Sequence, residues 1–335
     1  MSRGGSMPGR GKGWGGVGVM AAVVGVLVLA VALLLPLARG HREGRGTQPV
    51  ADTAGAAAET CANPEAQTLR PSTADGPTIA KIKARTGAQR KLIVGVDQNS
   101  YRWGYRDPNN TRAALEGFDI DLVHEIAGNI LGDPGAVQFR AIPTNERINA
   151  IQKGEVDMVV RTMTINCARI EQVAFSAPYF RTGQQVLAPK AALGITGFDK
   201  SLAGKKVCVA SGSIAETEFE ADKQGATALV VPNQLDCLVR LQLGEADAVI
   251  TDSALAASQA AQDPTVELKG RPFTTEYYGV AMKLDANDLV SRVNQVLAQY
   301  RSGGWQTSYK KWLSPTMGND FAPYLPTNPV YLRTR

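Results

Sequence analysis

Several short apolar segments of this sequence end in polar residues that could together bind a small charged molecule. The polar residues are Asp97, then Arg161, Thr162, Thr164 and Arg169, then Ser211-Gly212-Ser213, and finally Asp252. They supply guanidinium groups, hydroxyls, backbone amides at a helix start, and carboxylates. A zwitterionic amino acid needs this set, because a guanidinium group pairs with its α-carboxylate and an anion pairs with its ammonium group.

Two runs of alternating strands and helices position these residues. The first run has predicted strands at Lys91–Val96, Val137–Ile142 and Asp157–Val160 and helices at Phe118–Leu131 and Thr144–Lys153. The second has strands at Lys206–Ala210, Ala228–Val231 and Ala246–Thr251 and helices at Ile214–Lys223 and Leu235–Leu243. A last segment adds a strand at Tyr278–Lys283 and helices at Leu289–Tyr300 and Trp305–Leu313. This alternation predicts an α/β protein with mostly parallel sheets and flanking helices.

The repeat of the pattern predicts two lobes with a ligand cleft between them, because open α/β sheets bind ligands at the carboxyl ends of their strands. We expect lobe 1 to comprise residues 88–185 and 277–313 and lobe 2 residues 186–276. The crossings between the lobes are expected at Thr182–Pro189 and Thr274–Gly279. Residues 314–335 contain Pro315, Pro323, Pro326 and Pro329 and are expected to form an irregular tail.

The charge distribution argues against a nucleic-acid-binding protein. The first 46 residues carry six basic side chains and one acidic one, which accounts for the whole net charge of +5. The rest of the chain has no net positive charge to attract a phosphate backbone. The two histidines, His41 and His124, exclude a histidine-rich metal site, and no cysteine spacing supports a metal. We expect no cofactor.

The N-terminal region has the pattern of an exported, anchored protein. Residues 1–16 are basic, and Val17–Ala38 is an uncharged apolar stretch long enough to cross a bilayer as a helix. We expect a cytoplasmic basic tail at 1–16, a signal anchor at 17–38 and a flexible stalk at 39–87, with a short helix near Thr78–Thr86. The folded part is then extracytoplasmic. The alternative is a cleaved signal peptide and a secreted protein.

Cys61, Cys167, Cys208 and Cys237 form an even set, which suggests two disulfides in an exported chain. The sequence alone allows three pairings. We favour Cys208–Cys237 within lobe 2 and Cys61–Cys167 between the stalk and lobe 1. Buried free thiols are the alternative.

Five sequence blocks, in order, resemble the family 3 bacterial extracellular solute-binding proteins, which bind amino acids. The blocks are Leu115–Asp121, Asp157–Phe180, Leu202–Glu216, Ala246–Asp252 and Gly304–Leu313. The cysteine placement and the segment Val96–Pro108 are most similar to the actinobacterial glutamine/glutamate-binding branch. The resemblance implies a periplasmic-binding-protein-like fold of type II, a monomer whose two lobes close on a small amino acid.

The resemblance also implies roles for single residues. Arg169 matches the arginine that holds the α-carboxylate, and Thr164 matches a position that hydrogen-bonds the same group. Thr162 matches a position whose carbonyl meets the ammonium group, and Asp252 matches the acid that binds it. Ser213 and Ile214 match the lobe 2 loop that completes the carboxylate site. For Ser213 a helix-capping role is open as well, since Ser213-Ile214-Ala215-Glu216 is a capping box, and Asp252 is open to the same helix-cap interpretation.

Selectivity depends on Asp97, Arg147 and Arg161. Asp97 matches a position near the distal end of the ligand and favours an amide or an ammonium group there over a second carboxylate. Arg147 aligns with an arginine that holds a side-chain carboxylate in acidic-ligand relatives, and Arg161 adds positive charge nearby. Two arginines against one aspartate favour glutamate or aspartate over glutamine or asparagine. The alternative is that these arginines pair with Asp97 or with other acids of the protein.

The resemblance implies delivery of the ligand to a membrane permease of the ABC type. A second possibility is a sensing subunit that presents its ligand state to a membrane signalling protein. A remote alternative is a dehydratase of cyclohexadienyl acids on the same fold, with Asp252 or Asp97 as the general acid or base. We expect a binding protein and not an enzyme.

Overall fold

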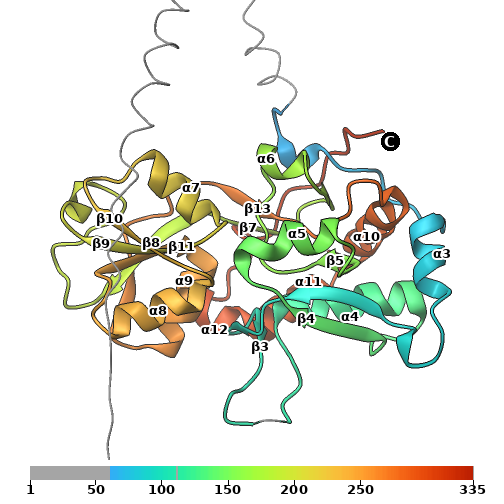
Figure 1. Ribbon diagram of the computed structural model, residues 1–335, viewed down its shortest axis with the longest axis horizontal. Coiled ribbons are helices and arrows are strands. Elements are labelled where there is room, and N and C mark those ends of the chain that lie inside the picture. Colours follow the sequence, from blue (N-terminus) through green and yellow to red (C-terminus); the bar gives the residue numbers. More distant parts are fainter. Residues whose placement is uncertain (1–60, 111, 335) are drawn as a thin grey trace, which may run out of the picture. The chain divides into compact units, whose positions relative to one another are not determined.

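The computed structural model describes residues 61–110 and 112–334. These residues contain two five-stranded sheets, each with helices packed against it, and two short two-stranded sheets. In Figure 1 the strands of one large sheet, labelled β8 to β11, lie apart from those of the other, labelled β4 and β5. The predicted two-lobed α/β fold is therefore confirmed.

The lobe 1 sheet has the strand order β4-β1-β5-β14-β6. The strands β1, β4 and β5 are parallel, and β14 runs antiparallel to both β5 and β6. The elements of this lobe are α3 (Pro77–Lys83), β1 (Leu92–Val96), β2 (Asn99–Ser100), β3 (Gly104–Tyr105), α4 (Phe118–Leu131), β4 (Val137–Ala141), α5 (Arg147–Gln152), β5 (Met158–Val159), α6 (Cys167–Ile170), β6 (Ala174–Phe175), β14 (Ala281–Met282), α10 (Asn287–Tyr300), α11 (Gly304–Trp312) and α12 (Ser314–Met317).

The lobe 2 sheet has the equivalent order β10-β9-β11-β8-β12, in which β8 alone runs against the other four strands, as β14 does in lobe 1. Its elements are β8 (Gln184–Pro189), β9 (Lys206–Ala210), α7 (Ile214–Ala221), β10 (Thr227–Val231), α8 (Gln234–Gln242), β11 (Ala248–Asp252), α9 (Ser253–Gln262) and β12 (Val266–Lys269). In each sheet four of the five strands thus run in one direction, as expected, and one strand runs against them. That strand, β8 or β14, is the one that arrives from the other lobe.

The lobes are joined by an antiparallel ribbon of β7 (Phe180–Thr182) and β13 (Glu276–Tyr278). Lobe 2 begins at Gln184, so most of the predicted crossing Thr182–Pro189 is a strand of its sheet. Gly183 joins the ribbon to β8, and an added Cβ there would lie 2.0 Å from the carbonyl oxygen of Thr274. Only glycine allows the two crossings to approach this closely.

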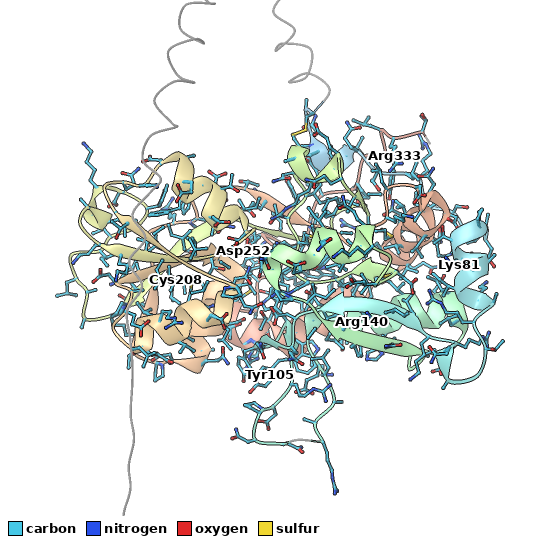
Figure 2. The ribbon with its side chains drawn as sticks, in the orientation of Figure 1. Lys81, Tyr105, Arg140, Cys208, Asp252 and Arg333 are labelled. Atoms are coloured by element: carbon cyan, nitrogen blue, oxygen red, sulfur yellow. A yellow bond between two sulfur atoms is a disulfide. The ribbon has the colours of Figure 1, made fainter. Side chains whose placement is uncertain are left out.

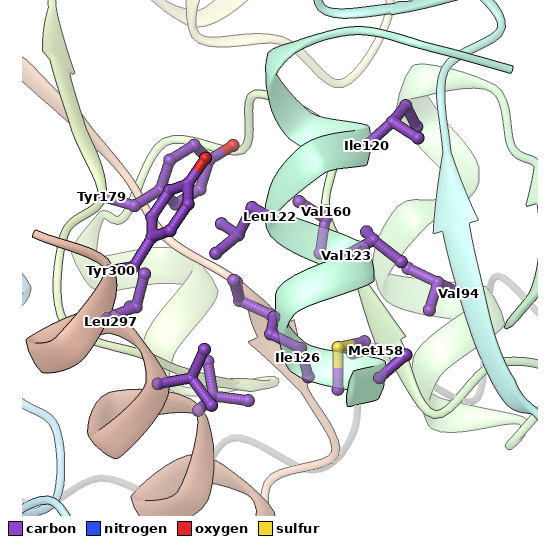
Figure 3. Close-up of a cluster of buried hydrophobic side chains, with 14 of the residues drawn as sticks. Val94, Ile120, Leu122, Val123, Ile126, Met158, Val160, Tyr179, Leu297 and Tyr300 are labelled. Carbon is purple, nitrogen blue, oxygen red and sulfur yellow. The ribbon is translucent and has the colours of Figure 1, made fainter. Parts of the chain in front are cut away.

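The core of lobe 1 is built around α4, which has the predicted bounds. A Cβ at Gly117, just before the helix, would lie 2.3 Å from the Trp103 carbonyl oxygen. The helix is buried on two sides, and Figure 3 shows it between the sheet and α10. The residues labelled there are Ile120, Leu122, Val123 and Ile126 of the helix, Val94, Met158 and Val160 of the sheet side, Tyr179, and Leu297 and Tyr300 of α10.

Residues 61–87 are a packed part of lobe 1, and the expectation of a flexible stalk across this stretch was wrong. The side chains of Ile79 and Ile82 are completely or almost completely buried. The backbone amide of Ile79 donates to the carboxylate of Asp288 in α10. The two isoleucines sit three residues apart on one face of α3, a spacing that gives a short helix one apolar side.

The C-terminal tail also packs against lobe 1. Past α12 it is irregular, as expected, but Phe321 and Tyr324 lie against the core. Tyr324 stacks on Phe180 of the hinge ribbon, with ring centroids 5.7 Å apart. Leu332 donates a backbone hydrogen bond to Ala66. Both ends of the described chain are therefore tied to the same lobe.

Both favoured disulfides are present. Cys61 is bonded to Cys167 and Cys208 to Cys237, so no described cysteine is a free thiol. The expected tail at 1–16, the anchor at 17–38 and the stalk up to residue 60 lie outside the described residues. Within the described part of the chain, no helix combines the length and the apolar character that a membrane span requires.

Candidate functional site

The predicted site residues gather where the two sheets approach each other at the hinge. Asp252 is the last residue of β11 and lies between the lobes in Figure 2. Hydrogen bonds cross between the lobes around it. Thr144 of lobe 1 donates to the side-chain oxygen of Gln234 at 2.9 Å, and Arg161 donates to that of Asn233 at 3.2 Å. The two lobes are in direct contact at the site.

Arg161 and Asp97 form an ion pair of 2.7 Å. The guanidinium group of Arg161 also donates to the hydroxyl of Thr144 at 2.9 Å. Arg161 follows β5 and Asp97 follows β1, and these strands are neighbours in the sheet. The alternative interpretation, in which Arg161 is neutralised by Asp97, is thus what the structure shows.

Arg147 is buried without a carboxylate partner among the described residues. It is the first residue of α5, is 3% exposed, and forms no ion pair. Its guanidinium group donates to the carbonyl oxygens of Thr144 at 2.8 Å and Gly212 at 3.2 Å. Burial lowers its pKa well below the usual value, and the charges of Arg169 and Arg161 add to this. A buried cation of this kind is suited to an anionic ligand group.

Arg169 is the second buried arginine of the described part that has only carbonyl partners. Its guanidinium group donates to the carbonyl oxygens of Thr164 at 2.7 Å and Gly212 at 3.0 Å. The side chain of Asn166 caps α6 by accepting from the backbone amide of Arg169. Burial lowers the pKa of Arg169, partly opposed by Glu276 and Asp252. Arg147 and Arg169 thus converge on one carbonyl of the opposite lobe.

That carbonyl belongs to the loop before α7. Gly212 has a φ of +71°, and its amide donates to the carboxylate of Glu216 at 2.7 Å. The hydroxyl of Ser213 accepts from the amide of Glu216, so its helix-capping role is confirmed. Ile214 is the first residue of the helix and is buried. The loop therefore brings backbone groups at a helix start against the two arginines.

Asp252 stands directly before α9, at the N-cap position, but its side chain does not cap the helix. It is 6% exposed, and its carboxylate accepts from the side-chain amide of Gln184 at 2.8 Å. Burial raises its pKa well above the usual value, and repulsion by Glu276 raises it further. The helix-cap interpretation of Asp252 is thus not supported, which leaves its carboxyl group available to the cleft.

Glu276 is a site residue that the sequence analysis missed. It lies in β13 of the hinge ribbon, is 5% exposed, and its carboxylate accepts from the hydroxyls of Thr164 at 2.6 Å and Thr274 at 2.8 Å. It belongs to no motif. The available signal was its position two residues before the buried Tyr278, which places both on one face of a strand.

Thr162 is held in an unusual backbone conformation by a buried acid. Its φ is +41°, in the left-handed region, and its amide donates to the carboxylate of Asp119 at 3.0 Å. The other oxygen of Asp119 accepts from the hydroxyl of Tyr179. Burial raises the pKa of Asp119 to about 7. Asp119 therefore fixes the loop that carries Arg161, Thr162 and Thr164.

All nine predicted site residues lie in this region, and the structure adds Glu276 and Gly212 to them. The result is two buried arginines facing backbone carbonyls, one neutral ion pair, and two acids next to each other. No group of histidine, cysteine, aspartate and glutamate side chains in the described part of the chain is arranged to hold a metal ion.

Comparisons with known proteins agree with this fold. The model of the bacterial extracellular solute-binding proteins, family 3, matches residues 92–315. The glutamine-binding protein of an ABC transporter from Bacillus subtilis (strain 168) is 33% identical over 237 residues, which are 70% of this chain and 84% of the relative. A glutamate-binding protein from Corynebacterium efficiens is 28% identical and covers 68% of this chain and 79% of its own length.

Solved structures show the same architecture. A mutant of the arginine-binding protein from T. maritima superposes with a TM-score of 0.65 at 29% identity, covering 71% of this chain and all of that one. A solute receptor for L-cysteine from Neisseria gonorrhoeae gives a TM-score of 0.69 at 25% identity over 75% of this chain. Since the family model spans both lobes and the hinge between them, this chain belongs to the bacterial extracellular solute-binding proteins of family 3.

Proposed function

We propose that the chain binds a polar amino acid outside the cytoplasm, with glutamate and aspartate preferred over glutamine and asparagine. As a member of this family it is a binding protein and not an enzyme. The observation that carries the proposal is the pair Arg147 and Arg169. Both are buried, neither has a carboxylate partner in the described part of the chain, and both point at Gly212.

The two arginines have different roles in the proposal. Arg169, with Thr164 and the loop of Ser213 and Ile214, binds the α-carboxylate of the ligand, and Asp252 with the carbonyl of Thr162 binds its ammonium group. Arg147 binds the carboxylate of an acidic side chain. Because Arg161 is neutralised by Asp97, the preference for an acidic ligand rests on Arg147 and no longer on two arginines. The relatives named for glutamine and glutamate support a ligand of this size.

Binding works by closure of the two lobes on the hinge ribbon. A ligand held by Arg169 from lobe 1 and by Asp252 from lobe 2 contacts both halves only when they are close together. It therefore binds the closed form better and raises its population. The contact between Thr144 and Gln234 is one of those that form on closure.

The ligand proposal is tested by thermal shift and calorimetry on the full chain in a mild detergent. A ligand at 100 times its dissociation constant adds about 2.7 kcal/mol of stability. We expect glutamate and aspartate to raise the melting temperature more than glutamine and asparagine. The Arg147→Met variant should lose this preference, whereas a control variant of the exposed Arg140, Arg140→Met, should keep it. A stronger response to the amides contradicts the proposed selectivity.

We further propose that the protein is a monomer held at the cell surface by the apolar segment Val17–Ala38 and delivers its ligand to an ABC permease. The relative named as part of an ABC transporter supports this partner. Uptake of labelled glutamate should fall in a deletion strain and return with the intact gene. Normal uptake in that strain, together with ligand-dependent capture of a membrane signalling protein, would instead support the sensing role.

A further inference from the structure

Two acids from different parts of the fold lie near the hinge ribbon. Asp252 ends β11 of lobe 2, and Glu276 belongs to the hinge strand β13. Both are more than nine-tenths buried. Thr182 pairs with Glu276 across the hinge ribbon, and its hydroxyl lies 3.0 Å from that of Ser253, the residue after Asp252, so the two acids lie near each other. Two carboxylates that lie near each other and away from water repel each other, and burial together with this repulsion raises the pKa of Asp252 well above its usual value.

The surroundings of the pair do not neutralise it. Arg147 of α5 and Arg169 of α6 attract Asp252 through their charges, but neither forms an ion pair with either acid. The remaining contacts come from neutral groups, which are Gln184, Thr164 and Thr274 as hydrogen-bond donors. The hydroxyl groups of Tyr278 and Tyr179 also face the acids.

The surroundings of Tyr278 give a second indication that a ligand group could bind beside the two acids. Its ring is completely buried, and its hydroxyl lies near Asp252 without forming a hydrogen bond of good geometry to any described residue. The side-chain oxygen of Gln184, the residue that donates to Asp252, is also buried and without a partner. Buried polar groups normally find a partner, so these atoms mark a place where a ligand group with several N–H donors would fit.

We propose that Glu276 is a second ligand-binding acid, which shares one proton with Asp252 until the ammonium group of the ligand displaces that proton. This inference rests on the proposed function. Before the ligand binds, Asp252 carries the proton, and its O–H group donates a hydrogen bond to the carboxylate of Glu276. When the ammonium group enters between the two carboxyl groups, its N–H bonds replace that hydrogen bond, and the proton leaves to solvent.

The charges balance in this exchange. The pair carries one negative charge before binding and two afterwards, and the added charge is compensated by the single positive charge of the ammonium group. Binding of each ligand molecule thus releases one proton. Protons compete with the ligand, so affinity should fall as the pH is lowered, and burial together with repulsion from Glu276 raises the pKa of Asp252 and brings this competition towards neutral pH.

The pair of Asp252 and Glu276 should also exclude certain molecules from the site. A ligand without a cationic nitrogen cannot replace the shared proton and leaves the tyrosine and glutamine atoms without partners. We therefore expect 2-oxoglutarate and N-acetylglutamate, which keep the carboxylates of glutamate but lack its ammonium group, to bind at least about 100-fold more weakly than glutamate.

The inference is tested by calorimetry of glutamate binding to the full chain in two buffers of equal pH, phosphate and Bis-Tris, which both buffer near pH 6 and differ in ionisation enthalpy. The difference in binding enthalpy between the buffers gives the number of protons released. We expect about one proton per ligand near pH 6. Binding that releases no proton overturns the inference and leaves the proposed function standing. Failure of every amino acid to bind overturns both.

Two variants locate the source of the proton. In Glu276→Gln the amide donates to Asp252, so Asp252 is ionised beforehand and binding should release no proton. The matched control is Glu155→Gln, which changes an exposed glutamate of lobe 1 and should release as many protons as the unaltered protein. Proton release that persists in a folded Glu276→Gln variant contradicts the inference. If that variant does not fold, the two-buffer measurement on the unaltered protein still decides.

Discussion

Arg161 and Asp97 form an ion pair of 2.7 Å whose guanidinium group is almost completely buried. The two residues follow neighbouring parallel strands of lobe 1, so the strand order itself brings them together. The pair lies where the two lobes touch, since Arg161 also donates to Asn233 of lobe 2, and it adds no net charge there. This leaves Arg147 and Arg169 as the cations that are open to a ligand.

Asp97→Asn should destabilise the protein. The change leaves the Arg161 charge buried with no anion beside it, and breaking a buried pair in this way costs about 3–5 kcal/mol. Urea unfolding measures the loss. The control is Asp285→Asn, since Asp285 faces Lys283 at 4.0 Å on the surface and contributes little. A loss below about 1 kcal/mol for Asp97→Asn would show that the pair is not needed for stability.

Arg169→Met should weaken ligand binding by about 100-fold or more. Each hydrogen bond to a charged group contributes about 1.5–3 kcal/mol, and a guanidinium group gives two of them to a carboxylate. Calorimetry with the best ligand of the thermal-shift screen measures the change. Arg70→Met, a variant of an exposed arginine, is the control. Affinity within twofold of the unaltered protein would remove Arg169 from the site.

The two disulfides should differ in their effect on binding. Cys61–Cys167 closes a loop of 106 residues and Cys208–Cys237 one of 29, so their removal should cost about 5 and about 4 kcal/mol. Cys167 begins α6, the helix that carries Arg169. We therefore expect the serine variant of the first pair to lose ligand affinity as well as stability, and that of the second pair to lose mainly stability. Unfolding and calorimetry on each double variant check this, and equal losses of affinity would contradict it.

Asp119 should make the stability of the protein depend on pH. Its pKa is about 7 in the folded protein against 3.8 for the unperturbed group. Between these values the folded state holds a proton that the unfolded state has lost, so stability falls as the pH rises from 4 to 7. The shift corresponds to about 4 kcal/mol.

Asp119→Asn removes this titration and keeps the size of the side chain. Urea unfolding at several pH values should therefore give a flatter curve for the variant than for the unaltered protein. Asp133→Asn, at an exposed position, should leave the curve unchanged. Parallel curves for Asp119→Asn and the unaltered protein would mean that Asp119 is ionised over the whole range.

Much of the fold could be predicted because the elements that cover the sheets have strong periodic patterns. The helix Phe118–Leu131 and the strand Lys206–Ala210 have the predicted bounds. The helix α9 was missed, because its alanine-rich sequence has no marked polar face. The predicted strand Tyr278–Lys283 is in fact two strands, since the chain leaves the hinge ribbon at Tyr278 before it enters the lobe 1 sheet.

The sequence was sufficient to identify most residues of the site, but not to show which of them contact each other. The motifs locate Arg169, Thr164 and Asp252, whereas the partner of Arg161 depends on which strands are neighbours. Glu276 could not be assigned from its surroundings in the sequence, because it approaches Asp252 only through the antiparallel ribbon of the hinge. The packing of residues 61–87 could not be predicted from the sequence either, because it depends on contacts with α10, more than 200 residues away.

The pairing of Thr182 with Glu276 puts the entrance and the exit of lobe 2 side by side. Residues 183–275 therefore form a continuous insertion with both ends at one point, while the described chain ends and the Cys61–Cys167 disulfide belong to lobe 1. Such a segment can be replaced as one unit by the corresponding segment of a related protein. Replacing it with the matching segment of a family member would change Asp252, Ser213 and the lobe 2 partners of the contacts between the lobes, and would leave the sheet of lobe 1 unaltered.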